Sequence, residues 1–300
     1  MRLASVCKPE GKATASARRP EPVIRARSII GNADAPKPGP DGTRRRVVVG
    51  RSSKLLIPPE NQLGLETAFG ADERTRILQV TAQPWRMIAS LDIVGSWNET
   101  IGTGWLVGPR TVVTAGHCVF DRNQLGGWAE KITLTFGQDE DVHAAGPVVS
   151  TRFTALDRWV KRQEPDFDIG AIHLDTPIGE RLNWFGVASR PDKDLLDFLV
   201  NISGYPAERG GRQQWWARNR IRAVRPRRIF YDIDTTGGQS GAPVFLYEDE
   251  TTPPLVVGIH AYGIGGTPAN LPLTVNSAPR IIPEVVEQIE AWVRQDEQTA

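Results

Sequence analysis

The stretch Thr111-Val112-Val113-Thr114-Ala115-Gly116-His117-Cys118 joins a strand-like run to a tight turn of small residues that carries a histidine. The β-branched side chains at 111–114 favour an extended backbone, and the small residues after them end the run. Similar short apolar runs, bounded by Gly, Pro, Asn or Asp, recur from about residue 75 onward. They are residues 87–94, 104–107, 132–136, 169–174, 199–202, 229–233 and 255–259. Many short strands separated by turns predict an all-β sandwich or barrel.

Only the end of the chain has a helical pattern. Pro283 is followed by apolar residues at 285, 286, 289, 292 and 293, a spacing that places them on one face of a helix. A proline and a glutamate at the start suit the first turn of a helix. The sequence therefore predicts a C-terminal helix from about residue 283.

The first 60 residues differ from the rest in charge and composition. They hold 13 Lys and Arg against 5 Asp and Glu, whereas residues 61–300 hold 23 against 30. The net charge of +1 thus combines a basic segment with an acidic body. Eight of the 23 prolines lie in the basic segment, which has no apolar periodicity. We expect residues 1–66 to be a disordered basic tail or pro-segment.

Several classes of protein are disfavoured by simple counts. No run of eighteen apolar residues is present, so no transmembrane helix is expected. Two cysteines are too few for a disulfide scaffold or a cysteine-rich zinc site. The acidic run 139–141 with His143 fits no metal-ligand spacing and is interpreted as a solvated loop. Trp215-Trp216, among arginines, is interpreted as a wall of a cleft rather than a nucleic-acid site.

Three segments carry the residue types that acyl transfer needs. They are 114–118 with a histidine, 166–172 with an acid before a strand, and 235–244 with the run Gly-Gly-Gln-Ser-Gly. A serine hydroxyl needs a base to take its proton, and the base needs a carboxylate to orient it. These roles fall to Ser240, His117 and Asp168, with Asp166 as a competitor for the acid. The backbone amides of Gly238 and Ser240 are the candidate oxyanion hole.

These motifs resemble those of chymotrypsin-like serine proteases, and in particular the bacterial glutamyl endopeptidases. Further matching segments are 101–112, 175–179, 202–206 and 257–260. The resemblance covers roughly residues 67–295 and places the acid directly before the apolar pair, which favours Asp168. It implies two six-stranded antiparallel β-barrels with the site in the cleft between them. The first barrel would be residues 67–185, and the second, with the C-terminal helix, residues 186–300.

The resemblance also implies a substrate class. Thr235 and His260 stand where the family lines the pocket for the residue before the scissile bond, and these groups suit a glutamate carboxylate. Trypsin-like pockets carry an acid at the position of Thr235. The family's mature N-terminus often helps to hold the acidic side chain. Cleavage after Glu66 would free the amine of Thr67 for this role.

The expected protein is thus a monomeric serine endopeptidase that acts on protein or peptide substrates. It needs no metal or cofactor and has no nucleic-acid or membrane partner. The resemblance implies secretion, but no apolar signal run follows Arg2 and Lys8, so an intracellular protease is also compatible with the sequence. The same motifs would suit a catalytically weak protease-like binding module, or a protease of different specificity in which His260 is a core histidine. Cys118 is expected to be a buried free thiol, because Cys7 is the only other cysteine.

Overall fold

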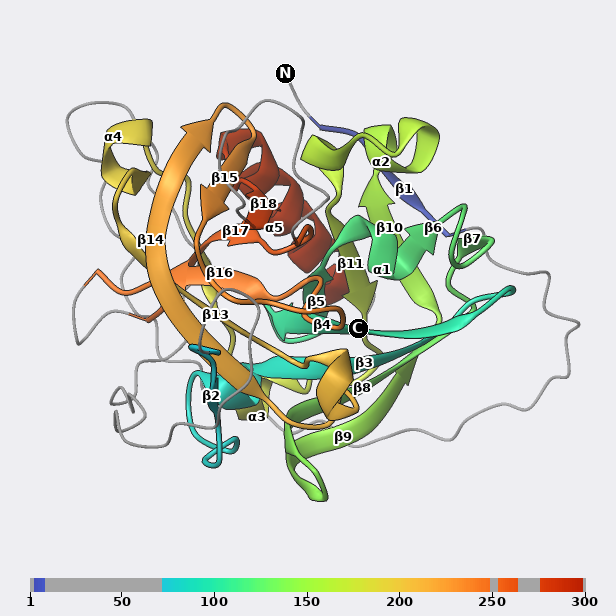
Figure 1. Ribbon diagram of the computed structural model, residues 1–300. Coiled ribbons are helices and arrows are strands. Elements are labelled where there is room, and N and C mark those ends of the chain that lie inside the picture. Colours follow the sequence, from blue (N-terminus) through green and yellow to red (C-terminus); the bar gives the residue numbers. More distant parts are fainter. Residues whose placement is uncertain (1–2, 9–71, 249–252, 264–275, 299–300) are drawn as a thin grey trace, which may run out of the picture. The chain divides into compact units, whose positions relative to one another are not determined.

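The computed structural model describes residues 3–8, 72–248, 253–263 and 276–298. These residues form mainly strands, nearly all paired antiparallel, in two eight-stranded sheets and one small two-stranded sheet (Figure 1). The prediction of an all-β fold with a helix at the end of the chain is confirmed. No helix in these ranges is long and apolar enough to cross a membrane. Most of the predicted basic tail, with Glu66 and Thr67, lies outside the described residues.

The first sheet runs in the hydrogen-bonded order β1, β10, β11, β5, β4, β3, β8 and β9. Its strands are β1 (Ser5–Cys7), β3 (Ile88–Val94), β4 (Glu99–Leu106), β5 (Thr111–Thr114), β8 (Lys131–Asp139), β9 (Val142–Ser150), β10 (Arg152–Leu156) and β11 (Gly170–His173). Only Thr151 separates β9 from β10, so one bent strand pairs with β8 at one end and with β11 at the other. This closes a barrel of six strands around a buried apolar interior, with β1 added at its edge.

The second sheet runs in the order β12, β17, β16, β13, β14, β15 and β18. Its strands are β12 (Gly186–Val187), β13 (Leu199–Gly204), β14 (Trp215–Arg225), β15 (Arg228–Tyr231), β16 (Pro243–Leu246), β17 (Leu255–Ile259) and β18 (Asn276–Pro279). An isolated bridge between Gly258 and Arg280 joins the end of β17 to the end of β18. The six strands from β13 to β18 therefore close a second barrel, and β12 adds a parallel pair with β17.

Two short strands from the N-terminal part of the chain are not where the sequence placed them. Residues 5–7, expected to be disordered with the tail, form β1 on the edge of β10, whose backbone groups are open to pairing. β2 (Thr75–Arg76), assigned to the first barrel, instead pairs with Trp215 and Trp216 of β14 in the second barrel. A two-residue strand has too little pattern to reveal which edge it joins.

The remaining elements are short connections and one long helix. The connections are η1 (Trp85–Met87), α1 (Gly116–Val119), α2 (Asp157–Arg162), η2 (Pro165–Phe167), α3 (Gly179–Leu182), α4 (Asp192–Leu195), η3 (Ala207–Arg209) and the hairpin of β6 (Phe120–Asp121) and β7 (Gly127–Trp128). The long helix is α5 (Pro283–Gln298). Two of the connections, α1 and η2, hold candidate catalytic residues.

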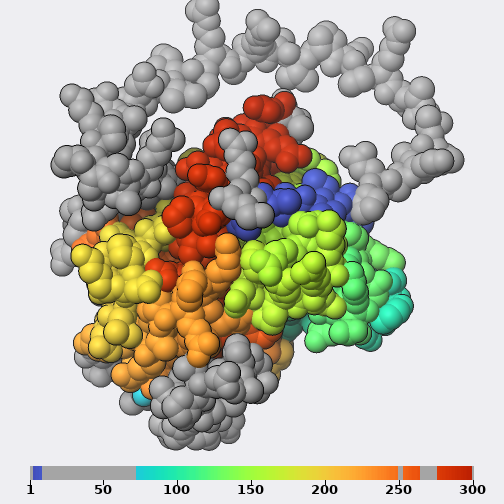
Figure 2. All heavy atoms as spheres, turned by 90° about the horizontal axis from the view of Figure 1, so that it is seen from above, coloured from blue at the N-terminus to red at the C-terminus, as the bar shows by residue number. Residues whose placement is uncertain are grey.

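Helix α5 returns from the second barrel to pack on the first. Its buried face joins the interior cluster of the first barrel through Val285, Ile289, Trp292 and Val293. Figure 2 shows this red helix beside the blue segment 3–8, and Trp292 Nε1 donates to Ser5 Oγ at 3.4 Å. Buried Asp296 accepts hydrogen bonds from Thr111 Oγ1 at 2.6 Å and from His173 Nδ1 at 2.8 Å. The predicted apolar face is confirmed, whereas the buried carboxylate had no signal in the sequence.

Candidate active site

His117 and Asp168 are joined by two hydrogen bonds. His117 lies in α1, the single turn after β5, and Asp168 follows η2 and precedes β11. The Asp168 carboxylate is fully buried, and its Oδ2 lies 2.8 Å from His117 Nδ1. Its Oδ1 accepts a hydrogen bond from the backbone amide of His117 at 2.8 Å. Both carboxylate oxygens therefore orient the same residue, which places Nε2 of the ring opposite the carboxylate.

The packing around this pair leaves little freedom. Gly116 precedes His117, and a Cβ there would lie 2.7 Å from the Trp159 ring and 2.9 Å from Asp168 Oδ1. The Trp159 ring meets the His117 ring edge-on, with centroids 6.3 Å apart. Burial opposes the charged form of His117, but the adjacent Asp168 carboxylate outweighs it and raises the pKa of His117 well above its ordinary value.

Ser240 lies beside the turn that carries His117. It belongs to residues 234–241, here called the catalytic loop, which connects β15 to β16. The carbonyl of Ser240 accepts a hydrogen bond from the Thr103 amide of β4 at 2.8 Å. The same carbonyl lies 3.6 Å from the Sγ of Cys118, the residue after His117. The three segments singled out in the sequence are thus brought together, from both barrels.

Two glycines of the catalytic loop have backbone angles that favour glycine. Gly238 has φ +92° and Gly241 has φ +91°. A Cβ at Gly238 would lie 2.4 Å from the Tyr205 carbonyl, and one at Gly241 would lie 2.1 Å from the Thr103 carbonyl. The fully buried hydroxyl of Thr103 also donates to the Gly238 carbonyl at 2.9 Å and accepts from the Tyr205 amide at 3.0 Å. Thr103, a polar residue between two glycines of a strand, was missed in the sequence.

The predicted pocket residues Thr235 and His260 have defined partners. Thr235 Oγ1 accepts a hydrogen bond from Asn276 Nδ2 at 2.8 Å. His260 is buried, and its Nδ1 lies 2.7 Å from the Tyr231 hydroxyl. Its carbonyl accepts from the Gly241 amide at 2.6 Å, which ties His260 to the catalytic loop. Burial, together with the nearby His117, lowers the pKa of His260 to about 3. Its imidazole is therefore neutral.

Asp166, the competing acid, is placed elsewhere. Its Oδ1 accepts a hydrogen bond from Arg228 Nε of β15 at 2.8 Å. The Arg228 guanidinium also donates to Ser277 Oγ at 3.1 Å and lies 4.9 Å from the centre of the Tyr262 ring. That ring is 6.4 Å from the His117 ring. Burial raises the pKa of the Tyr262 hydroxyl, and the charge of the Asp168 carboxylate raises this pKa further.

The other residues singled out in the sequence make contacts away from the His117–Asp168 pair or are simply buried. Cys118 is a buried free thiol, as expected. Asp139 of the acidic run pairs with Arg76 at 2.8 Å. The guanidinium groups of Arg209 and Arg218 stack over Trp215 and Trp216, respectively. Within the described ranges, no group of three or more His, Cys, Asp or Glu is placed to hold a metal ion.

Comparison with known proteins agrees with this arrangement. A family model described as a trypsin-like peptidase domain matches residues 102–259. The glutamyl endopeptidase of Bacillus licheniformis is 33% identical over 241 residues, which cover 78% of this chain and 72% of that protein. A protein of Bacillus subtilis named extracellular metalloprotease is 31% identical over 256 residues, or 82% of this chain and 78% of the relative. The chain belongs to the trypsin-like peptidase family.

Solved structures share the same fold. A Glu endopeptidase in complex with MPD superposes with a TM-score of 0.63 at 24% identity, covering 75% of this chain and 98% of that one. The protease Anisep from Arthrobacter nicotinovorans superposes with a TM-score of 0.57 at 16% identity, covering 69% and 95%. Fold and family together make this protein a serine endopeptidase of the chymotrypsin-like class. Its substrates are accordingly proteins or peptides.

Proposed function

We propose that this endopeptidase works through a triad of Ser240 as nucleophile, His117 as general base and Asp168 as orienting carboxylate. The observation that carries the proposal is the pair of 2.8 Å hydrogen bonds by which a buried carboxylate holds both the ring and the backbone of His117. A carboxylate in this position fixes the tautomer in which Nε2 accepts a proton, and it stabilises the imidazolium that results. The position of Ser240 beside Cys118 supports its role as the partner of that base.

The proposed reaction has two steps that share one set of groups. Ser240 Oγ attacks the peptide carbonyl carbon while His117 takes the hydroxyl proton. The backbone amides of Gly238 and Ser240 bind the resulting oxyanion, and the protonated His117 then gives its proton to the departing amine. The acyl-enzyme is hydrolysed by a water that follows the same path. Because Thr103 holds the carbonyls of Gly238 and Ser240, the oxyanion amides are pre-positioned before substrate arrives.

We propose glutamate as the preferred residue before the scissile bond. The Thr235 hydroxyl accepts from Asn276, and a hydroxyl that accepts there still has its own hydrogen to donate. A neutral His260 whose Nδ1 accepts from Tyr231 carries its hydrogen on Nε2. Two neutral donors, one on partly buried Thr235 and one on buried His260, suit a carboxylate, and its negative charge favours protonation of His260 on binding. The relative from Bacillus licheniformis, named a glutamyl endopeptidase, supports this preference.

The same preference suggests how the enzyme matures. We propose that it cuts after Glu66 and frees the amine of Thr67 to assist the pocket, with the basic residues 1–66 as pro-region. Both residues lie outside the described ranges. Action outside the cell is proposed from the name of the Bacillus subtilis relative, which is given as extracellular. N-terminal sequencing of the active enzyme, purified from cells and from medium, tests both points, and a start other than Thr67 argues against the cut.

The experiment that tests the catalytic proposal is a peptide panel that varies only the residue before the scissile bond. The full chain is assayed beside its Ser240→Ala variant. Cleavage after glutamate that disappears in Ser240→Ala supports the triad and the pocket together. Cleavage after other residues that depends on Ser240 keeps the triad and removes the pocket assignment. Cleavage that persists in Ser240→Ala, or no cleavage by folded and processed protein, overturns the proposed mechanism.

A further inference from the structure

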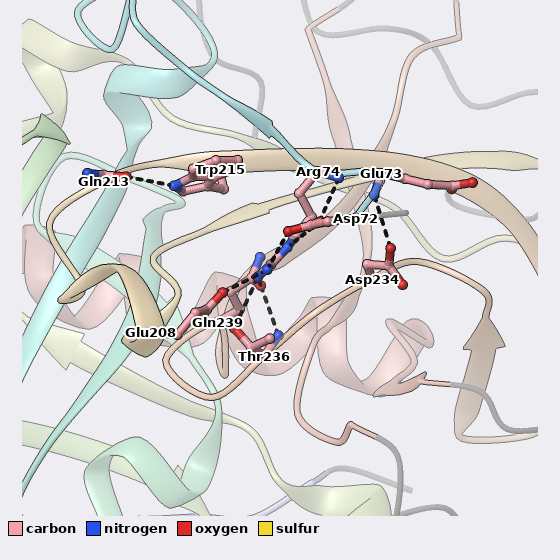
Figure 3. A network of polar contacts seen from close by, with 9 residues as sticks. All are labelled: Asp72, Glu73, Arg74, Glu208, Gln213, Trp215, Asp234, Thr236 and Gln239. Atoms are coloured by element: carbon pink, nitrogen blue, oxygen red, sulfur yellow. Dashed lines mark hydrogen bonds and ion pairs between the residues drawn. The ribbon is translucent and has the colours of Figure 1, made fainter. Parts of the chain in front are cut away.

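Arg74, a buried arginine near the start of the described range 72–248, contacts the catalytic loop. Arg74 lies just before β2, and its side chain is only 6% exposed. Its Nε and Nη2 donate to Asp72 Oδ1 and Oδ2, each at 2.9 Å, in a two-pronged pair. Nη1 donates to Thr236 Oγ1 at 3.1 Å and to Gln239 Oε1 at 3.2 Å (Figure 3). Nη2 also pairs with Glu208 Oε1 at 2.7 Å.

The two partners in the catalytic loop flank the residues proposed to do the chemistry. Thr236 follows Thr235 of the pocket, and Gln239 lies between Gly238 and Ser240. The buried Gln239 side chain crosses the loop, because its Oε1 also accepts from the Thr236 amide at 3.0 Å. Arg74 thus fixes the one side chain that spans the loop. A second contact from the same segment, the Glu73 amide to Asp234 Oδ2 at 3.1 Å, holds the start of the loop (Figure 3).

The network needs a charged, planar group at this point. Asp72 is buried, and although burial opposes its charged form, the hydrogen bonds from Arg74 lower its pKa. Buried charges are tolerated only when they are paired and hydrogen-bonded. The guanidinium meets five acceptor oxygens from four residues at fixed angles, whereas a lysine ammonium is a single point charge on a flexible stem. Lysine at residue 74 would keep the charge but lose the simultaneous contacts with Asp72 and the catalytic loop.

We propose that Arg74 is a positioning residue for catalysis, which holds the oxyanion amides and the rim of the pocket in place through Gln239 and Thr236. The inference rests on the proposed function, because it assigns to Arg74 the geometry of groups that act in that mechanism. Arg74 is carried by the segment that directly follows the proposed mature N-terminus. When β2 of this segment pairs with β14, Arg74 is brought to the catalytic loop and fixes the position of that loop.

The chain offers a matched control for this proposal. Arg76 lies two residues away on the same short strand, and its Nε pairs with Asp139 Oδ1 at 2.8 Å instead of with the catalytic loop. We compare Arg74→Lys with Arg76→Lys and measure kcat, KM and the thermal unfolding midpoint of the full chain. Because small misplacements of catalytic groups cost up to about 100-fold in rate, kcat is expected to fall about 10- to 100-fold in Arg74→Lys. Arg76→Lys should keep the parent kcat.

A chemical rescue separates positioning from folding. In Arg74→Ala, millimolar ethylguanidinium is expected to restore kcat in a saturable manner, and it should have no effect on Arg76→Ala. If Arg74→Ala does not fold, Gln239→Met removes the loop acceptor and should lower kcat by a similar factor. Arg74→Lys and Gln239→Met should then be non-additive, because they remove the same contact.

The outcomes distinguish this inference from the proposed function beneath it. Parent enzyme with Ser240-dependent cleavage, together with an unchanged kcat per folded molecule in Arg74→Lys, overturns the role of Arg74 alone. The role of Arg74 is also overturned if the losses of kcat in Arg74→Lys and Gln239→Met are additive in the double variant. It is overturned as well if the loss of kcat in Arg74→Lys merely follows the fraction of folded protein. If the parent itself has no Ser240-dependent cleavage, the proposed function is wrong and the inference is wrong with it.

Discussion

Arg228 of β15 in the second barrel forms an ion pair with Asp166, two residues before Asp168, at 2.8 Å. The guanidinium is almost fully buried, whereas the Asp166 carboxylate is about half exposed, at 49%. This contact explains how two acids in one short segment receive different tasks. Asp166 joins the segment to the opposite barrel, and Asp168 turns inward to His117.

The two carboxylates should therefore differ sharply when each is replaced by its amide. Asp168→Asn keeps the shape but favours the wrong tautomer of His117, and a loss of about 10⁴ in kcat is expected. Asp166→Asn should leave kcat nearly unchanged and lower the free energy of unfolding by about 1 kcal/mol, because the pair is partly exposed. Both quantities are measured on one glutamyl peptide and by urea unfolding. Equal losses of kcat in the two variants would contradict the assignment.

The pH dependence of cleavage should report His117. The Asp168 carboxylate raises the pKa of His117, so the proton is held to a higher pH than the ordinary value of about 6.5. As the pH falls through this raised pKa, His117 becomes protonated and stops accepting the proton of Ser240. We expect kcat/KM to be high above the transition and to fall below it, with a midpoint above 6.5.

The same profile in Asp168→Asn tests the cause. Without the carboxylate, the pKa of His117 loses the strongest influence that raises it, while burial still lowers it, so the transition should move to lower pH. The remaining activity is measured from about pH 4 to 10 with a glutamine peptide beside the glutamate peptide. The glutamine peptide separates ionisation of His117 from ionisation of the substrate. A midpoint that does not move in Asp168→Asn would show that another group controls the acid side.

Thr103 provides a test of how the catalytic loop is held from the first barrel. Thr103→Val removes the hydroxyl that donates to the Gly238 carbonyl and accepts from the Tyr205 amide. Each buried group left without a partner costs about 1–3 kcal/mol, so the unfolding free energy should fall within this range or more. kcat should fall as well, because the turn at Gly238 is released. Thr103→Ser keeps the hydroxyl and serves as the control. A normal kcat in Thr103→Val would mean that this contact does not set the geometry of the catalytic loop.

The sequence predicts most where the signal is local. The turn before His117, the acid before an apolar strand and the glycine-rich segment at Ser240 each have a recognisable local pattern. The apolar face of α5 follows in the same way from helical spacing and is confirmed. In these cases neighbours in the sequence supply the constraint, so the pattern can be read without knowing the pairing of distant strands.

The contacts that could not be predicted from the sequence join residues far apart in the chain. Arg74 meets Gln239 across 165 positions, and Thr103 meets Gly238 across 135. A single arginine or threonine has no local pattern that names its acceptor, because that acceptor is defined only when the barrels close. The same reason explains β2, since two residues carry no periodicity that selects β14 over the first barrel. Polar contacts between segments far apart in the chain could therefore not be predicted from the sequence.

Asp296 of α5 offers a last test, in which stability and catalysis should separate. Its carboxylate accepts from Thr111 on β5 and from His173 on β11. Thr111 and His173 are directly paired at one end of the β5–β11 ladder. At the other end, β5 runs on toward His117, and β11 begins shortly after Asp168. Asp296→Leu leaves both donors without this acceptor, so the unfolding free energy should fall by about 3 kcal/mol.

The reaction rate per folded molecule should nevertheless stay close to the parent value in Asp296→Leu. Four paired positions of backbone ladder, from Thr111 with His173 to Thr114 with Gly170, separate this anchor from His117 and Asp168 and hold the register without it. Asp296→Asn, which keeps one acceptor oxygen, should lose less unfolding free energy than Asp296→Leu. Its kcat per folded molecule should stay equally close to the parent value. Active-site titration with a serine-directed phosphonate gives the folded, competent fraction, and urea unfolding gives the stability. A large fall in kcat per titrated site would mean that the register of β5 and β11, and hence the distance between His117 and Asp168, depends on the C-terminal helix.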